Sequence, residues 1–127
     1  MRRADSGRWD VPGGFMEPGE GVRECCAREA LEETGLQVQV RRLIGVYTNP
    51  HVAVEYADGN RWQFVALFFE ADAIGGALSG SEESTEVGFL SREEIERMDL
   101  ERFGRLRVAD AFGRQAGAFV RDDIDLG

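Results

Sequence analysis

The stretch that decides the fold runs from Gly14 to Leu36 and reads GFMEPGEGVRECCAREALEETGL. Its second part, residues 21–34, contains no proline, is rich in glutamate, alanine and arginine, and stops at Gly35. Glycine is common just past the last turn of a helix, because it adopts the left-handed conformation without a steric penalty. We therefore predict a helix from Gly21 to Thr34.

Three glutamates of this predicted helix, Glu29, Glu32 and Glu33, lie on one face, within an arc of about 100°. They repel one another in the absence of a cation. Clustered carboxylates are the hard oxygen ligands that Mg²⁺, Mn²⁺ or Ca²⁺ prefers, although a solvated acidic face is the alternative interpretation. Another sector is apolar and suited to packing on a sheet; it carries Ala27, Ala30 and Leu31.

The spacing of the whole stretch resembles the Nudix box, the signature of the Nudix hydrolase superfamily. Gly14 is followed after five residues by Glu20, and seven residues later comes the run REALEETGL at residues 28–36. Every specified position of the box is matched, with Ala30 a small choice for its apolar position. The resemblance implies an α+β or α/β fold, namely a Nudix-type α/β/α sandwich with a mixed β-sheet, in which the box forms a loop, a helix and a loop.

The resemblance also implies roles for individual residues. Glu32 and Glu33 correspond to metal ligands, and Glu29 corresponds to a ligand or to the base that acts on the attacking water. Arg28 is expected to orient a glutamate by charge-assisted hydrogen bonds. Glu20 is expected to anchor the loop against the helix. The implied catalytic set is Glu29, Glu33 and Arg28, with Mg²⁺ or Mn²⁺ as cofactor.

Two further metal ligands are expected from outside the helix. Gly13 is expected to offer its backbone carbonyl, since glycine permits a close approach. Family members often add an acidic residue from a later loop, for which Glu82, Glu83 and Glu86 are the candidates. Glu83 is preferred for its distance upstream of Phe89, and a solvated acidic loop is the alternative.

Composition limits the partners. The chain has 127 residues, 24 acidic against 15 basic, and a net charge of −9. This balance argues against binding in a groove of DNA or RNA, and it repels a phosphate-rich ligand unless a cation mediates. No apolar run approaches the ~18 residues of a membrane span. The adjacent Cys25 and Cys26 close no useful loop, so we expect free thiols and a cytoplasmic location.

The remaining sequence predicts one domain over residues 1–127. Residues 62–71 form the longest apolar run, which we expect inside a sheet covered on both faces. A hairpin turn is predicted at Asp58-Gly59-Asn60, after an alternating stretch that includes Tyr56. The other predicted strands are 8–11, 36–47 with a bend near Arg41-Arg42, and 86–90, and the other predicted helices are 91–98 and about 103–112.

Other side chains have weaker functional interpretations. His51 is a candidate general base, and Tyr47 and Trp62 are candidates for stacking on a nucleobase. Arg41 and Arg42 are candidates for a phosphate contact. For each of them a structural role is the favoured expectation.

The function expected from these features is Mg²⁺-dependent hydrolysis of the pyrophosphate link in a nucleoside diphosphate joined to another moiety. ADP-ribose-like, dinucleotide and nucleoside triphosphate substrates all stay open. A nucleotide-sensing Nudix domain without catalysis and an acidic domain without a ligand are the alternatives. Only 13 residues precede Gly14, fewer than the family usually has. We therefore expect a sheet edge that is paired in a homodimer or completed by residues upstream of Met1.

Overall fold

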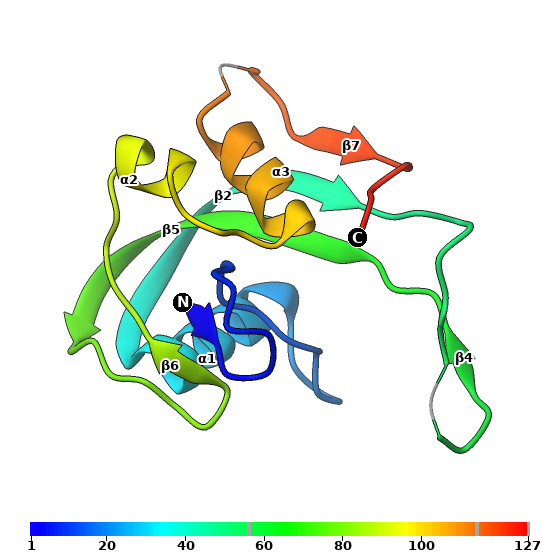
Figure 1. Ribbon diagram of the computed structural model, residues 1–127, viewed down its shortest axis with the longest axis horizontal. Coiled ribbons are helices and arrows are strands. Elements are labelled where there is room, and N and C mark those ends of the chain that lie inside the picture. The colour runs from blue at the N-terminus through cyan, green and yellow to red at the C-terminus, as the bar shows by residue number, and fades with distance from the viewer. Residues whose placement is uncertain (56, 114, 127) are drawn as a thin grey trace.

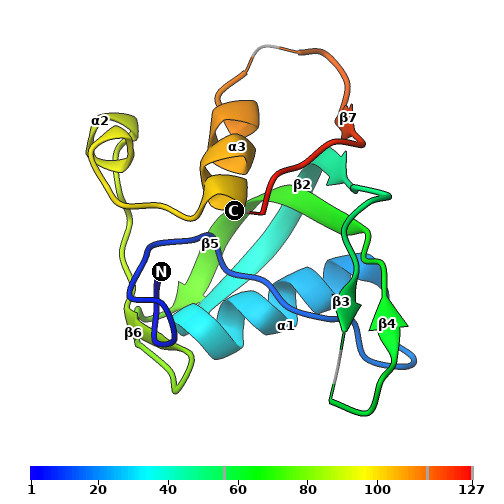
Figure 2. The same ribbon diagram turned by 45° about the vertical axis from the view of Figure 1, so that its right-hand side comes forward.

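A mixed β-sheet lies at the centre of the molecule. The computed structural model describes residues 1–55, 57–113 and 115–126. Strand β2 (Leu36–Tyr47) lies between β5 (Ala66–Gly76), which is antiparallel to it, and β7 (Phe119–Arg121), which is parallel to it. Helices α1 (Val22–Thr34) and α3 (Arg102–Ala111) lie on opposite sides of this sheet (Figure 2). The expected α/β/α arrangement with a mixed sheet is confirmed.

Five short elements complete the fold (Figure 1). Strand β1 (Arg2–Arg3) pairs antiparallel with β6 (Ser84–Glu86), in a ladder separate from the central sheet. Strands β3 (Val54–Glu55) and β4 (Arg61–Trp62) form a hairpin that extends away from the sandwich. Helix α2 (Arg92–Glu96) follows β6 along the chain. Helix α1 thus has the central sheet on one side and the small β1–β6 ladder near its end.

The strongest local signals in the sequence predict their elements well. Helix α1 ends where expected, because Gly35 has φ 78° and donates its N–H to the Leu31 carbonyl. Helix α2 begins after Ser91, whose side chain accepts a hydrogen bond from the Glu94 N–H. Strand β2 covers the predicted residues and changes register at Arg41, as the predicted bend requires. The predicted hairpin turn is present, with Gly59 at φ 85°, whereas Tyr56 lies outside the described residues.

The long apolar strand predicted over residues 62–71 is wrong in two respects. The chain leaves the β4 ladder after Trp62 and enters β5 only at Ala66. Strand β5 is an edge strand, and two of its apolar side chains, Leu67 and Ile74, are 40% and 63% exposed. The sequence suggested a run inside the sheet. Strand β5 instead lies at the edge, with a hydrogen-bonded neighbour on one side only, and Leu67 within the run is 40% exposed.

Two weaker strand predictions are also wrong, and one strand was not predicted. In place of a strand over residues 8–11 there are isolated bridges from Trp9 to Arg2 and Leu100. The strand predicted over residues 86–90 lies earlier, at Ser84–Glu86. Strand β7 was not predicted, because three residues that pair with β2 from a distant part of the chain leave almost no local pattern.

The predicted packing face of α1 is also wrong in part. Leu31 is 48% exposed, whereas Glu33 is only 3% exposed. The Glu33 carbonyl accepts a hydrogen bond of 2.8 Å from the buried Ser84 hydroxyl, which holds the end of α1 against β6. The helix is therefore covered on its Glu33 side, while Leu31 lines a shallow surface groove with Val38.

No helix in the part of the chain that the structure describes has the length and apolar character needed to cross a membrane.

Candidate active site and metal centre

An arginine on α1 organises the loop before the helix. Arg28 donates through Nε to Glu20 Oε2 at 2.7 Å and through a terminal nitrogen to Glu20 Oε1 at 2.9 Å. It also donates to the Phe15 carbonyl at 3.0 Å. Hydrogen bonding to Arg28 lowers the pKa of Glu20 to about 2, and the same contact raises the pKa of Arg28. The bidentate pair ties the loop to α1. It agrees with the expectation that Glu20 anchors the loop against the helix, whereas the sequence did not name Arg28 as its partner.

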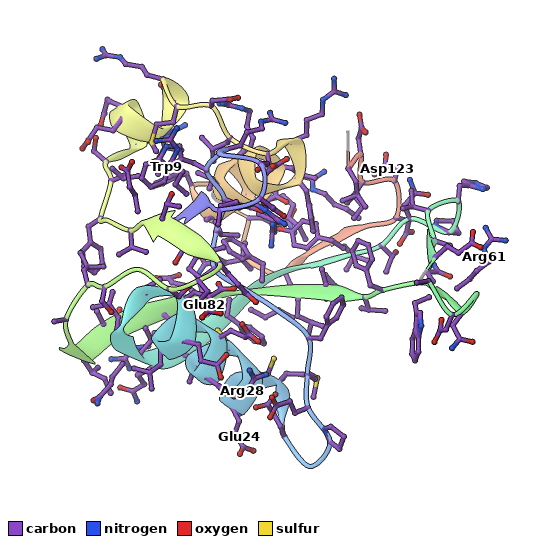
Figure 3. The ribbon with its side chains drawn as sticks, turned by 60° about the horizontal axis from the view of Figure 1, so that its bottom comes forward. Trp9, Glu24, Arg28, Arg61, Glu82 and Asp123 are labelled. Atoms are coloured by element: carbon purple, nitrogen blue, oxygen red, sulfur yellow. The ribbon has the colours of Figure 1, made fainter. Side chains whose placement is uncertain are left out.

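The same guanidinium contacts two of the glutamates of the acidic face. It donates to Glu29 Oε1 at 2.8 Å and to Glu32 Oε2 at 3.2 Å. The Glu29 side chain is only 12% exposed, whereas that of Glu32 is 57% exposed. Arg28 therefore bridges the loop and the acidic face, and Figure 3 shows it on α1 beside that loop.

Glu33 lies at the protected end of the acidic face. Its Oε2 accepts a hydrogen bond of 2.8 Å from the Gly13 N–H. Burial raises the pKa of Glu33 to about 7 against the opposing hydrogen bond from Gly13, and the nearby carboxylates Glu29 and Glu83 raise it further. A buried carboxylate beside two other acidic groups is an electrostatic environment that a cation would relieve.

The three candidates for an acidic ligand from the later loop, Glu82, Glu83 and Glu86, make different contacts. Glu83 lies beside Glu33, close enough to act on its pKa. Glu86 instead forms an ion pair of 3.0 Å with Arg2. Glu82 is an exposed neighbour on the same turn. The structure thus brings Glu83, the preferred candidate, to the acidic face and engages Glu86 elsewhere.

A glycine gives Glu29 the space it needs. A Cβ at Gly14 would overlap the Glu29 carboxyl group, while the same atom at Gly13 would meet nothing. The carboxyl group of Glu29 therefore lies directly against the backbone of the loop. This close approach is a physical reason for glycine at the first position of the box.

The donor set fits a hard divalent cation. Carboxylates of Glu29, Glu32, Glu33 and Glu83 and the carbonyl of Gly13 are all oxygen ligands. Within the described residues, no three acidic, histidine or cysteine side chains converge closely enough to form a preformed metal cage. Arg28 accounts for part of this, because it holds Glu29 and Glu32 by hydrogen bonds. Cation binding at these residues therefore requires side-chain movement.

Other candidates from the sequence lie outside this cluster. Tyr47 is fully buried and donates to Asp110 Oδ2 at 3.0 Å, so it is a core residue. Trp62 is 59% exposed on the β3–β4 hairpin, whose Arg61 lies far from Arg28 in Figure 3. His51 is exposed in the preceding loop. Arg41 and Arg42 form ion pairs across the ladder with Asp72 and Glu70, so their structural interpretation holds.

Ser84 is a positioning residue that the sequence does not predict. Its hydroxyl fixes the end of α1 and so places the neighbouring Glu83 beside Glu33. Cys25 has a free thiol, as the sequence suggested, and it is buried; its sulfur lies 3.9 Å from both the Gly14 carbonyl oxygen and an Arg28 nitrogen. No local pattern marks a serine that acts by a contact 51 residues away.

Comparisons with known proteins agree with this geometry. The NUDIX domain family matches residues 1–111. A MutT-like protein of Streptomyces ambofaciens is 38% identical over 95% of this chain and 71% of its own length. An ADP-ribose pyrophosphatase of Methanocaldococcus jannaschii is 35% identical over 72% of this chain and 51% of its own length. The chain thus spans about half the length of the archaeal relative.

A solved structure has a similar fold. The crystal structure of a NUDIX hydrolase from Nitrosomonas europaea superposes with a TM-score of 0.70 at 27% identity, covering 97% of this chain and 69% of that one. The chain belongs to the Nudix hydrolase family.

Proposed function

We propose that this chain hydrolyses the pyrophosphate link of a nucleoside diphosphate joined to another moiety, in a reaction that depends on Mg²⁺ or Mn²⁺. The observation that carries the proposal is the buried Glu33 carboxylate, which lies between the Gly13 N–H and the neighbouring Glu83. Such a group is costly to bury as an isolated charge. Its position in a complete Nudix box supports a role in holding a cation.

The proposed cation ligands are Glu29, Glu32, Glu33 and Glu83, together with the Gly13 carbonyl. A divalent cation held there would neutralise charge on the pyrophosphate oxygens and assist the attack of water on phosphorus. Because Glu33 has a pKa of about 7, it is ready to lose its proton near neutral pH. Binding of the cation would favour the ionised form of this carboxyl group.

The proposed work of the protein side chains is positioning and proton transfer. Glu29 would bind the cation or accept the proton of the attacking water. Arg28 would hold Glu29 in place through its 2.8 Å hydrogen bond, and Glu20 would in turn fix Arg28. Because these contacts run in series, loss of Glu20 is expected to disturb Glu29 without removing a ligand.

A panel of substrates tests the proposed reaction and identifies the substrate class. The protein should be incubated with Mg²⁺ or Mn²⁺ and separately with ADP-ribose, dinucleotides and nucleoside triphosphates, and the products identified by mass spectrometry. We expect cleavage at a pyrophosphate link, with release of a nucleoside monophosphate or of pyrophosphate. Binding of these compounds without any turnover would contradict the proposal and favour a nucleotide-sensing domain.

We also propose a homodimer and a cytoplasmic location. The half-exposed Leu31 and the neighbouring Val38 line a groove that a second copy could cover in the proposed dimer. Sedimentation equilibrium gives the oligomeric state directly, and a single monomeric species at micromolar concentration would contradict the dimer.

The two free thiols, Cys25 and Cys26, support a reducing compartment and so the proposed cytoplasmic location.

A further inference from the structure

A buried ion pair joins α3 to the start of the loop that carries Gly13. Arg107 lies 3.1 Å from Asp10 Oδ1, and the two side chains are 13% and 9% exposed. The same Asp10 oxygen accepts a hydrogen bond of 2.8 Å from the Val11 N–H. Asp10 therefore contacts α3 with its side chain and fixes the backbone that leads to Gly13.

The surroundings of Arg107 make this pairing necessary. Its guanidinium lies 3.9 Å from the ring centre of Phe103 and 5.7 Å from that of Phe68. Burial lowers the pKa of Arg107, and Asp10 is the first group to oppose that shift. Arg3 also faces Asp10, at 3.7 Å from Oδ2, but its side chain is 40% exposed, against 13% for Arg107. A buried cation left without its carboxylate partner is strongly unfavourable.

Helix α3 is shaped to receive Asp10. A Cβ at Gly104 would overlap Asp10 Oδ1, so only glycine allows the carboxylate to reach this position. Gly104 and Arg107 are three residues apart and so lie on the same side of the helix. Close approach and charge pairing are thus two independent features of α3 that fix the same side chain.

We propose that Arg107 is a positioning residue for catalysis: acting through Asp10, it holds the Val11–Gly14 segment against Glu33. This inference rests on the metal site of the proposed function. Asp10 fixes Val11, Pro12 restricts the next backbone angle, and Gly13 donates its N–H to Glu33 Oε2. Groups that orient metal ligands in this way strongly affect metal affinity.

A second ion pair on α3 provides a matched control. Asp110, only 4% exposed on its side chain, pairs with Arg121 of β7 at 2.6 Å. It joins the same helix to the sheet. Among the described residues its side chain accepts hydrogen bonds from Tyr47 and Arg121, and none from the loop that carries Gly13. Loss of this pair should affect stability without affecting the metal site.

The test measures Mn²⁺ affinity by isothermal titration calorimetry in the wild type, in Arg107→Met and in Arg121→Met. We expect Arg107→Met to bind Mn²⁺ about 10- to 100-fold more weakly. We expect Arg121→Met to bind it within about twofold of the wild type, because the hydrogen bonds of its partner Asp110 do not reach the loop. Amide hydrogen exchange at Gly13 and Gly14 should become faster in Arg107→Met only.

A third variant separates positioning from folding. Asp10→Asn combined with Arg107→Met removes both buried charges and keeps an acceptor for the Val11 N–H. We expect this variant to melt near the wild-type temperature and still to bind Mn²⁺ at least about 10-fold more weakly. Wild-type affinity in either variant that lacks Arg107 would overturn the inference alone. A wild type that binds no Mn²⁺ would overturn the metal site and this inference together.

Discussion

Glu33 and Leu31 are two residues apart on α1, and their burial is the reverse of what the polarity of their side chains suggests. The charged residue is 3% exposed and the apolar residue 48% exposed. Glu33 is covered by the loop at Gly13 and by β6 through Ser84, and its pKa rises as a consequence. Burial of an acid beside other acids opposes folding. The contrast between Glu33 and Leu31 is what we expect if α1 holds the proposed cation site at a cost in packing.

The largest expected effect is on turnover. Glu33→Gln keeps the shape of the side chain but removes its charge, so we expect kcat to fall by about 10³-fold or more because a cation ligand is lost. Steady-state rates under saturating Mg²⁺ measure this. Glu24→Gln on the exposed first turn of the same helix is the control and should keep its rate. A Glu33→Gln variant with unchanged kcat would place the essential carboxylate elsewhere.

Gly14→Ala tests the close approach of the loop to the acidic face. The added methyl group would displace the Glu29 carboxyl group, and we expect the rate to fall about 10- to 100-fold as a result. Gly88→Ala is the matched control, since a Cβ there meets nothing. Equal rates in both variants would show that the position of Glu29 is not needed for catalysis.

The pKa of Glu33 predicts how stability depends on pH. Between pH 4.5, the usual pKa of a glutamate, and about pH 7, the folded protein keeps this proton whereas the unfolded chain has lost it. Within this window the free energy of unfolding without metal should therefore fall as pH rises, by up to about 3 kcal/mol. Urea titrations at several pH values measure the slope.

Two comparisons check that slope. Glu33→Gln should lack this contribution and should be more stable than the wild type at pH 8. Mg²⁺ should stabilise the wild type more at pH 8 than at pH 5, because the ionised carboxylate binds it. A wild type whose stability rises across the window would contradict burial of Glu33 as the dominant cause.

The smallest expected effect is that of Leu31→Ala. A half-exposed leucine contributes little packing, and alanine is at least as favourable in a helix, so the loss should stay below about 1 kcal/mol. The urea midpoint measures it. The value refers to protein dilute enough to be monomeric, where a loss of about 3 kcal/mol would show that Leu31 is covered within its own chain. A larger loss at higher protein concentration is what the proposed dimer predicts.

The sequence predicted the part of the molecule that local patterns control. The loop and helix of the box follow from spacing, and the end of α1 follows from Gly35 and its left-handed conformation. Arg28 and Glu20 were expected to orient a glutamate and to anchor the loop, and the structure shows that they pair with each other across eight residues of the same stretch. Glu83 was placed near the acidic face by its position relative to a later residue.

The contacts that the sequence did not predict join distant parts of the chain. Ser84 holds the end of α1 from 51 residues away, and Arg107 reaches Asp10 across 97 residues. The exposure of Leu31 depends in turn on which elements cover each side of the helix. Helical periodicity identifies a face, but it does not identify which face the rest of the chain covers.

The most direct test of the proposed metal site is anomalous diffraction from a crystal of the wild type soaked in Mn²⁺. We expect one strong peak within about 2.5 Å of carboxylate oxygens from Glu33 and Glu29. The peak should disappear in Glu33→Gln crystals treated in the same way. A peak at other residues, or a peak that persists without the Glu33 charge, would contradict the role assigned to this buried carboxylate.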